Sequence, residues 1–266
     1  MNQGEQTSED TESLNAKHYD SDFDLGSRSY NSLSSASNGL LYYALSSHSI
    51  KQAGQMYSYN PENEEIIHLG DLSEVSGEGD MNAIPQGKVH TNFYEYDSTL
   101  YFATHIGFYE SLDGMERYPE NIPDGYDPYP GGHFLSYDLE SGEFQKLATA
   151  PDGEGIVTMT MDRDRGQLYG ISWPTGYFLH YDLEEDEMKN LGLTSELGEA
   201  GTRGEDYRVL SRSMFIDPGS GFVYYSTADG EIFYYNPENE TINRVDGVDL
   251  KKDYFGEYDP SQPGSM

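Results

Sequence analysis

Histidine is the residue type best suited to chemistry in this 266-residue sequence, which contains no cysteine. Three of the seven histidines stand at the ends of short apolar stretches, and a fourth lies in a nearby loop: His90 (GKVHT), His105 (LYFATH), His133 (GGHFL) and His48. Neutral imidazoles bind transition metals, and three protein ligands leave a position open for water or substrate. This predicts a divalent metal cofactor, manganese or zinc. In the alternative interpretation, each imidazole caps a strand end and hydrogen-bonds to a loop carbonyl.

Other side chains could hold a ligand rather than a metal. Arg212 has the planar guanidinium that binds a carboxylate through two parallel hydrogen bonds. Trp173, the one tryptophan, could stack on a sugar ring, and a buried aromatic at a strand end is the other interpretation. Tyr126 and Tyr129 lie in a proline-rich and tyrosine-rich stretch and are further candidates for substrate binding.

These residues are positioned by a repeat that is visible along the chain. Four segments follow the pattern Gly-x-apolar-apolar-x-Tyr-(Asn/Asp)-(Pro/Leu), with small departures: 54–61 (GQMYSYNP), 132–139 (GHFLSYDL), 176–183 (GYFLHYDL) and 230–237 (GEIFYYNP). An acidic turn and a short strand follow each one, and a turn followed by an apolar-Tyr pair precedes it. Asp, Pro and Gly in these turns supply the backbone angles that tight hairpins need. Each unit therefore predicts four antiparallel strands, and no segment has a sustained helical period, so we expect essentially no helix.

The spacing of the units favours a β-propeller over a sandwich or an open β-array. The repeat glycines lie 78, 44 and 54 residues apart, and a four-stranded unit of about 40–50 residues is the period of a propeller blade. Propeller rings have about four to eight blades. We interpret the four visible blades as part of a larger ring, and a closed four-bladed ring is the alternative. The repeat domain is predicted at 26–247, with blades at 28–75, 86–150, 155–197 and 207–247. A disordered acidic tail is predicted before it, at 1–25. The Pro/Gly-rich segment at 248–266 is predicted to be a tail or the start of a further blade.

With these motifs, the region from Tyr30 to Asp246 resembles the broad β-propeller repeat superfamily that includes NHL, YVTN and quinoprotein-type repeats. It lacks the Trp-Asp dipeptide repeat and the double-glycine pattern of kelch blades. The resemblance implies a fold and leaves the function open, because this superfamily contains lyases, lactonases, dehydrogenases, hydrolases and binding platforms. Some propeller lyases that act on uronic-acid oligosaccharides use a histidine-rich manganese site, and the histidines of the second blade are faintly similar to it.

A propeller brings the candidate residues together on one face. Strand A of each blade lines the channel, so the start of strand A, the end of strand B and the start of strand C converge there, although strand C lies far from the axis. In the second blade these positions are His90, His105 and His133. The same blade carries an insertion at 108–131, which predicts either a lid beside the channel mouth or a contact with a neighbouring blade or subunit.

Composition excludes several classes of protein. The formal net charge is −33, which repels nucleic acid and anionic membranes. The acidic residues are spread along the chain, which favours a solvated surface adapted to high salt over a site for cations. We expect no membrane span, because no stretch approaches the roughly 18 apolar residues that one needs. No signal peptide is visible, and the compartment stays open.

Two main functions are compatible with these observations. The first is a binding or interaction platform with a pocket on the channel face for a small molecule, a glycan or a protein partner. The second is a metal-dependent lyase or hydrolase acting on a carbohydrate of the uronic-acid type, so whether the protein is an enzyme stays open. A purely structural role in a larger assembly is a third possibility.

Overall fold

The computed structural model describes residues 16–112 and 114–250, and within them the chain forms four antiparallel β-sheets and a short hairpin. The first sheet consists of β1 (Leu33–Ser35), β2 (Leu41–Leu45), β3 (Gln55–Asn60) and β4 (Glu65–Asp71). The second consists of β5 (Gln86–Val89), β6 (Tyr94–Tyr96), β7 (Thr99–Ile106), β10 (His133–Asp138) and β11 (Phe144–Thr149). The third consists of β12 (Gly155–Asp162), β13 (Gln167–Trp173), β14 (Tyr177–Asp182) and β15 (Glu187–Leu193). The fourth consists of β16 (Met214–Ile216), β17 (Val223–Ser226), β18 (Glu231–Asn236) and β19 (Thr241–Asp249).

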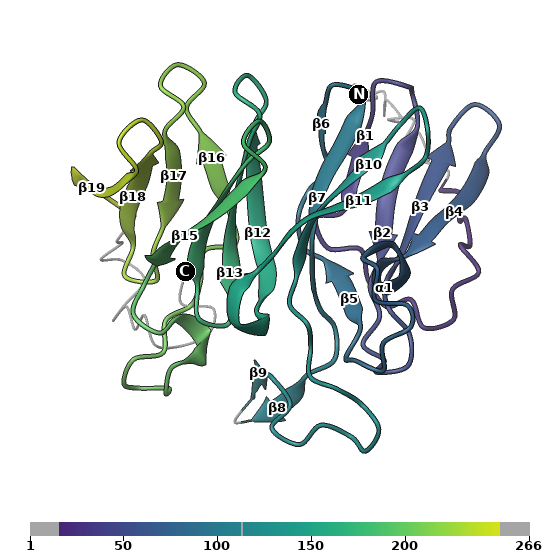
Figure 1. Cartoon of the computed structure of the whole chain (residues 1–266), viewed down its shortest axis with the longest axis horizontal. Helices are drawn as coiled ribbons and strands as arrows, with labels where there is room; N and C mark the ends of the chain where they lie inside the picture. Colours follow the sequence, from purple (N-terminus) through teal and green to yellow (C-terminus); the bar gives the residue numbers. More distant parts are fainter. Residues whose placement is uncertain (1–15, 113, 251–266) are drawn as a thin grey trace, which may run out of the picture.

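The sheets are arranged side by side as propeller-type blades. Figure 1 shows them in chain order from right to left, with the first and the fourth at opposite ends of the row. Their inner strands pack against one another, β2 on β5, β7 on β12, and β12 on β16. The predicted all-β class with four-stranded antiparallel blades is therefore confirmed, and the described residues form an open array that is consistent with an incomplete propeller.

The innermost strand of the second blade is broken, which the sequence pattern did not predict. The predicted strand from Lys88 to Tyr96 forms two pieces, β5 and β6, and both pair with β7. The β5–β7 register shifts between Gln86 and Lys88. His90 therefore follows the first piece instead of opening the strand, and it lies where the backbone leaves the sheet.

The Asn or Asp of the repeat shapes the turn between the third and fourth strands of each blade. In the third blade, Asp182 Oδ1 accepts hydrogen bonds from the backbone N–H of Glu184 and Glu185. Asn60, Asp138 and Asn236 accept equivalent backbone bonds in the other blades. Because Asp and Asn side chains bond their own backbone in this way, they favour turns over continued strands.

The repeat glycine is required by close packing. A Cβ on Gly132 would lie 2.4 Å from the carbonyl oxygen of Thr104 and 2.8 Å from the backbone nitrogen of Ile156 in the third blade. A Cβ on Gly54 would likewise lie 2.8 Å from the carbonyl oxygen of Gly87 in the second blade. In the first two blades the glycine thus marks the place where the third strand begins against its neighbour, whereas Gly176 and Gly230 adopt the positive φ that favours glycine.

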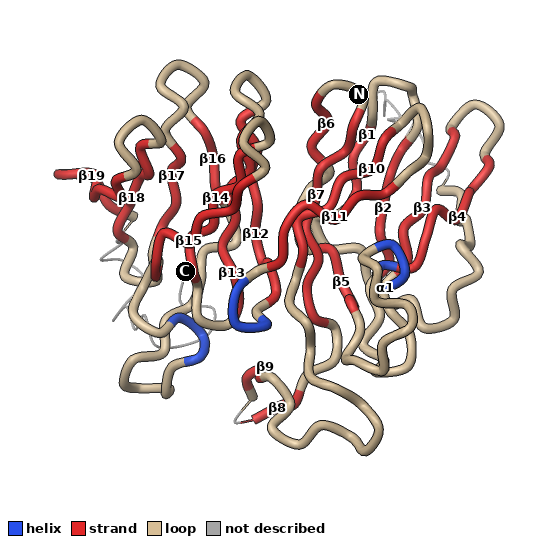
Figure 2. The backbone as a smooth tube through the Cα atoms, in the orientation of Figure 1, coloured by secondary structure: helices blue, strands red, loops and turns tan. Residues whose placement is uncertain are grey.

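Among the described residues, helix is limited to short turns, as Figure 2 shows. The turns are α1 (Leu72–Val75) and the 3-10 helices η1 (Pro151–Gly153) and η2 (Gly198–Ala200). In α1, Asp71 is the N-cap, and its Oδ1 accepts bonds from the backbone N–H of Ser73 and Glu74. The sequence Asp-x-x-Glu is a capping signal, so α1 could have been expected.

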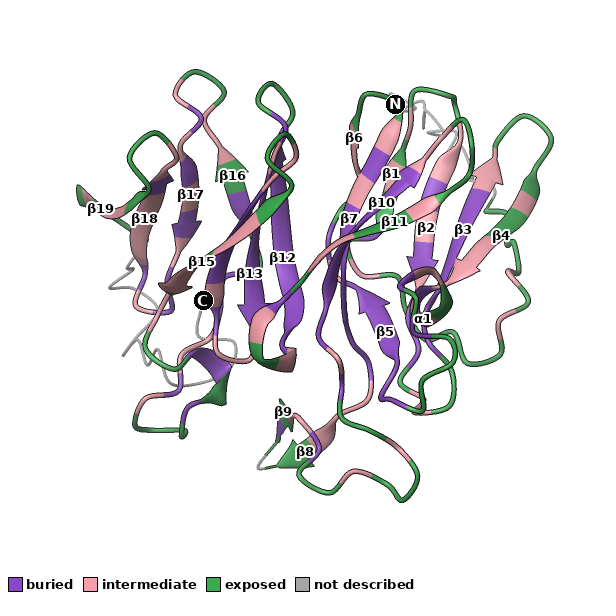
Figure 3. Ribbon diagram, in the orientation of Figure 1, coloured by how far each residue is buried: buried purple, intermediate pink, exposed green. Residues whose placement is uncertain are grey.

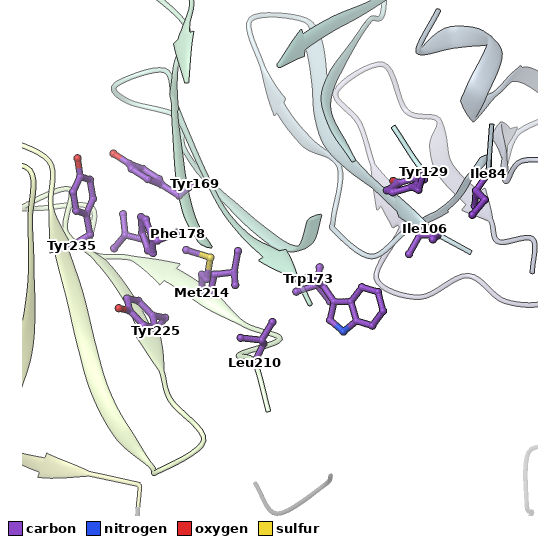
Figure 4. Packing of buried hydrophobic residues seen from close by; sticks show 13 residues of the cluster. Ile84, Ile106, Tyr129, Tyr169, Trp173, Phe178, Leu210, Met214, Tyr225 and Tyr235 are labelled. Atoms are coloured by element: carbon purple, nitrogen blue, oxygen red, sulfur yellow. The ribbon is translucent and has the colours of Figure 1, made fainter. Parts of the chain in front are cut away.

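Buried side chains join neighbouring blades. Figure 3 shows the inner strands β5, β12 and β13 largely buried, whereas the outer strands β4, β11 and β15 are partly exposed. The largest cluster takes residues from three blades, and Figure 4 shows Trp173 between the Ile106 and Tyr129 side and the Leu210 and Met214 side. Since about 25 cal/mol is gained per Å² of buried apolar surface, each interface stabilises both of its blades.

Residues 16–25, which the sequence placed in a disordered tail, lie along the first sheet. The ring of Tyr19 packs on that of Tyr59 with centroids 5.0 Å apart, and Ser21 hydrogen-bonds to Tyr43 at 2.8 Å. Residues 1–15 of the predicted tail and 251–266 of the predicted C-terminal segment lie outside the described residues.

Candidate functional site

Two imidazoles from the second blade meet at the inner ends of its strands. The rings of His90 and His105 are 4.8 Å apart and nearly perpendicular, and Tyr30 stacks on the other side of His90 at 4.1 Å. Nε2 of His90 and Nδ1 of His105 are buried and have no hydrogen-bond partner among the described residues. Most buried polar atoms in proteins have a partner, so this pair marks an unusual site.

A buried lysine lies beside these imidazoles. The Lys88 side chain comes from β5 and is only 1% exposed. Its Nζ donates a hydrogen bond to the hydroxyl of Tyr109 at 2.9 Å and lies 4.2 Å and 5.0 Å from the ring centroids of Tyr109 and Tyr30. Aromatic faces attract a cation within about 6 Å. Among the described residues, Lys88 forms no ion pair with a carboxylate. We call Tyr30, Lys88, His90, His105 and Tyr109 the lysine–imidazole cluster.

Burial keeps the imidazoles of this cluster neutral. It lowers the pKa of His90 to about 3, assisted by the positive charges of Lys88 and Arg212. Burial also holds the pKa of His105 well below its usual value, with His90 and Lys88 acting in the same direction. A neutral imidazole offers one donor and one acceptor nitrogen, so Nε2 of His90 can hydrogen-bond to a polar ligand, whereas Nδ1 of His105 is packed against Gly155.

Burial also shifts the pKa values of Lys88 and Tyr109, which belong to the same cluster. It lowers the pKa of Lys88 to about 8, although the negative charge of Glu116 opposes this effect. It raises the pKa of the Tyr109 hydroxyl well above its usual value, which keeps that hydroxyl protonated. The hydroxyl donates its proton to the carbonyl of Ile106 at 2.8 Å and accepts from Lys88. Tyr109 therefore anchors the insertion directly to the buried ammonium.

A cavity of about 450 Å³ lies next to the cluster. Its lining comes from the loop after β2 and from the insertion, namely His48, Gly107, Phe108, Tyr109, Glu110, Ser111, Gly114, Met115 and Glu116. Tyr109 belongs to both the lining and the cluster, so it separates the cavity from Lys88. His48 is exposed, and its ring centroid is 6.2 Å from that of Tyr109. Ligand pockets of about 300–1,000 Å³ are usual for small molecules.

The insertion fixes this wall of the cavity and also contacts the neighbouring blades. It folds into the hairpin β8 (Glu110–Leu112) and β9 (Met115–Arg117), which projects from the lower end of the array in Figure 1. The Tyr118 hydroxyl donates to the carbonyl of Gly153 at 2.8 Å and accepts from the N–H of Gly155 at 2.9 Å. Arg117 donates to the carbonyls of Glu199 and Gly201. The insertion thus makes the contact with a neighbouring blade that was one of the two roles suggested by its sequence, and the role of a lid stays a prediction.

Of the three aromatic candidates for substrate binding, Trp173 and Tyr129 are buried, and Tyr126 lines a different cavity. Trp173 is buried, its Nε1 donates to Glu199 Oε2 at 2.9 Å, and its ring packs on His105 and Tyr109. Tyr129 is buried, and its hydroxyl donates to Gln86 Oε1 at 2.6 Å. Tyr126 lines a separate cavity of about 300 Å³ near α1. The structure therefore places Trp173 and Tyr129 in the core, where no ring face is open for a sugar.

Arg212 lies close enough to the cluster to influence its charges, but its guanidinium is already paired. One nitrogen lies 2.7 Å from Glu199 Oε1, and another donates to the carbonyl of Leu210 at 2.9 Å. Its side chain is 44% exposed. Bidentate binding of a ligand carboxylate by Arg212 would require this pair to open.

The four predicted metal-binding histidines do not come together. His133 is buried in a separate network, where its Nε2 bonds to Glu78 Oε1 at 2.5 Å and its Nδ1 bonds to Thr149 Oγ1 at 2.9 Å. Both of its ring nitrogens are thus already partnered. No group of three or more His, Cys, Asp or Glu side chains in residues 16–112 and 114–250 is arranged to hold a metal ion. The predicted set of His48, His90, His105 and His133 therefore does not fit a shared manganese or zinc site.

Sequence reasoning missed Lys88, Tyr109 and Tyr30. Lys88 is two residues before the selected His90, in the stretch GKVHT, which was already assigned to an innermost strand. A lysine is rarely buried unless it is paired, so its place there was the available signal. Tyr109 falls near the start of the recognised insertion, but its inward direction depends on how the insertion folds back onto β7.

The fold and the site together define an all-β repeat protein of propeller type with a lysine–imidazole cluster at its inner strands. No known family model matches the chain, and a search of curated proteins found no match. Among solved structures, the chain is similar to an auxiliary nutrient binding protein from Bacteroides thetaiotaomicron, with 14% identity, a TM-score of 0.48, and coverage of 86% of this chain and 44% of that one.

Two further solved structures show a likeness of the same order. An oligogalacturonate lyase in complex with manganese matches with 12% identity, a TM-score of 0.48, and coverage of 82% of this chain and 53% of that one. A nidogen/laminin complex matches with 9% identity, a TM-score of 0.46, and coverage of 83% and 64%. The chain thus spans about half to two thirds of the length of these structures. No helix among the described residues is long and apolar enough to cross a membrane.

Proposed function

We propose that this protein is a binding platform that holds a small molecule or glycan in the cavity beside the lysine–imidazole cluster. The observation that carries the proposal is the pair of unpartnered buried nitrogens, Nε2 of His90 and Nδ1 of His105, close to a cavity of about 450 Å³. A buried polar atom without a partner costs about 1–3 kcal/mol. Such a cost is typical of sites where a ligand or water completes the hydrogen bonds.

The composition of the cavity wall supports a ligand of small-molecule size. It presents aromatic surface from Phe108 and Tyr109 together with a few polar groups, including His48 and Glu116. Binding pockets generally combine apolar and aromatic walls with a small number of placed polar groups. Because the wall belongs to an insertion that is attached to the third blade through Tyr118, it is held in place before a ligand arrives.

The alternative function, a metal-dependent lyase or hydrolase, is less well supported. It needs three ligands that face one metal ion with an open position, and His133 is committed to Glu78 and Thr149. Only His90 and His105 of the predicted set have facing rings with a free nitrogen each among the described residues. Binding without chemistry is therefore the function that the site supports best.

A ligand screen with cavity variants tests this proposal. Thermal unfolding would be followed for the wild-type protein with mono- and oligosaccharides and small metabolites, since a ligand that binds only the folded state raises the Tm. His48→Ala alters the exposed rim of the cavity, and Tyr109→Phe removes its link to Lys88. His18→Ala, which changes an exposed histidine that lines neither the cavity nor the cluster, is the control. We expect the stabilisation to persist in the control and to fall in both cavity variants; an equal shift in all proteins would contradict the proposal.

A further inference from the structure

Lys88 is a buried cation whose surroundings leave part of its bonding capacity unused. An ammonium group has three N–H donors, and among the described residues Lys88 donates one hydrogen bond, to Tyr109. The rings of Tyr30 and Tyr109 face its charge. An ammonium buried without an anionic partner is costly, and aromatic faces offset only part of that cost.

The electrostatic environment around the cluster is positive, although the protein as a whole has a net charge of −33. The charged groups that act on His90 are Lys88, Arg212 and His48, all of which disfavour a further positive charge. The same holds for His105, on which His90, Lys88 and Arg212 act. Arg28 adds its positive charge near Lys88 and His48.

Two carboxylates, Glu110 and Glu116, line the adjacent cavity, and Glu116 acts against the positive charge of Lys88. Glu116 is exposed, however, so water and salt screen its charge. Lys88 is buried and keeps a much larger share of its field. The buried ammonium of Lys88 is therefore the group that lacks an anionic partner among the described residues.

We infer that Lys88 is the anchor for a carboxylate group of the ligand, and that the neutral imidazole of His90 hydrogen-bonds to a polar group next to that carboxylate. This inference rests on the proposed function and narrows it to small carboxylic acids, including sugar acids. Tyr109 lies between the cavity and Lys88, so the carboxylate contacts the ammonium when the Tyr109 side chain moves aside. Arg212 is not needed as a direct contact, because it stays paired with Glu199.

The single tryptophan gives a direct readout of this site. Trp173 packs against His105 and Tyr109 with ring centroids 5.4 Å and 5.5 Å apart, so its fluorescence reports changes in the cluster. We would titrate the protein at constant ionic strength with two matched pairs of probes, acetate with acetamide and D-glucuronate with D-glucose. The expected result is a saturable fluorescence change with at least one carboxylate and a response at least tenfold weaker with its uncharged counterpart.

Lysine variants connect the response to Lys88. Lys88→Met keeps the length of the side chain and removes the charge, and we expect it to abolish the carboxylate response. Lys146→Met changes an exposed lysine on β11 and should bind as the wild type does. Undiminished carboxylate binding by a folded Lys88→Met protein would overturn the inference.

A measurement on the wild-type protein covers the case in which Lys88→Met fails to fold. NMR of lysine side chains labelled at Cε follows the pKa of each lysine separately, and the chain has only seven. A bound carboxylate should raise the pKa of Lys88 from about 8 and leave that of Lys146 unchanged. An unchanged Lys88 in the presence of saturating acetate and D-glucuronate would refute the inference. Equal binding of D-glucose and D-glucuronate would also refute it, while leaving the proposed binding function intact.

Discussion

Gly155 and His105 are in such close contact that only glycine fits: a Cβ on Gly155 would lie 2.1 Å from Nδ1 of His105. The first residue of the third blade thus forms a wall against which the imidazole of the second blade rests. This contact fixes the position of a ring that also touches His90 and Trp173. The geometry of the candidate site therefore depends on the interface between two blades.

Gly155→Ala should damage this interface. The added methyl group has to displace the His105 ring, and overpacking of this kind costs about 1–3 kcal/mol. Urea unfolding measures the loss, and the emission spectrum of Trp173 should shift in the folded variant. Gly219→Ala is the matched control, because Gly219 lies in an exposed turn and a Cβ there would meet only the Asp217 carboxylate at 3.7 Å. Equal stability of the two variants would show that the His105 ring can move away from Gly155 without a loss of stability.

Lys88→Met is expected to stabilise the folded protein at pH 7 while removing ligand binding. Burial lowers the pKa of Lys88 to about 8, so the charged form is less favourable in the folded chain than in the unfolded one. Burying a charge without an ionic partner is costly, and an apolar side chain of similar length removes that cost. Chemical denaturation of both proteins measures the difference. A strongly destabilised Lys88→Met protein would instead assign Lys88 a structural role through its two tyrosine contacts.

The depressed pKa of His90 predicts a contribution to acid unfolding. The folded value is about 3, against an ordinary value of 6.5, so between these two pH values the unfolded chain binds the extra proton. The stability that neutral His90 contributes is complete above about pH 6.5 and is lost as the pH falls toward 3. The free energy of unfolding of His90→Asn should therefore decline less over this range than that of the wild type. Parallel curves for the two proteins, with His18→Asn as a reference, would contradict the assignment.

Salt should stabilise this protein because its carboxylates repel one another. Raising KCl from about 0.1 M to about 1 M shortens the screening length from about 10 Å to about 3 Å, and the Tm should rise with it. A triple variant, Glu62→Gln, Glu140→Gln and Glu184→Gln, removes three exposed charges from blade turns. It should be more stable than the wild type at low salt and respond less to KCl. A Tm that is independent of salt in both proteins would argue against the predicted adaptation to high salt.

The blades could be predicted from the sequence because their signals are local. Gly54 and Gly132 meet neighbouring backbone, and the repeat glycines of the other two blades have positive φ. The following Asn or Asp shapes a turn within a few residues, so each motif meets a local requirement. The break between β5 and β6 could not be predicted in this way. It depends on a shift of register against β7, which is a relation between two strands and leaves little trace in either one.

The candidate site was predicted only in part. His90 and His105 were expected to meet from their positions at strand ends, and they do. His133 stands at the start of β10, as expected. The third strand of a blade lies too far from the axis, however, and Nε2 of His133 is already hydrogen-bonded to Glu78 Oε1. The partners of Lys88 come from an insertion and from the chain before β1, and no periodic pattern relates these segments to β5.

The attachment of the insertion has a consequence for how the molecule loses its structure. In a row of blades with nearest-neighbour contacts only, unfolding can begin at one end and proceed stepwise. Tyr118 ties the second blade to the carbonyls of Gly153 and Trp173, and Arg117 reaches the backbone at Glu199 and Gly201. The second and third blades and the approach to the fourth should therefore open as one cooperative unit, with matching rates of amide hydrogen exchange, whereas the outer strands of the first blade exchange earlier.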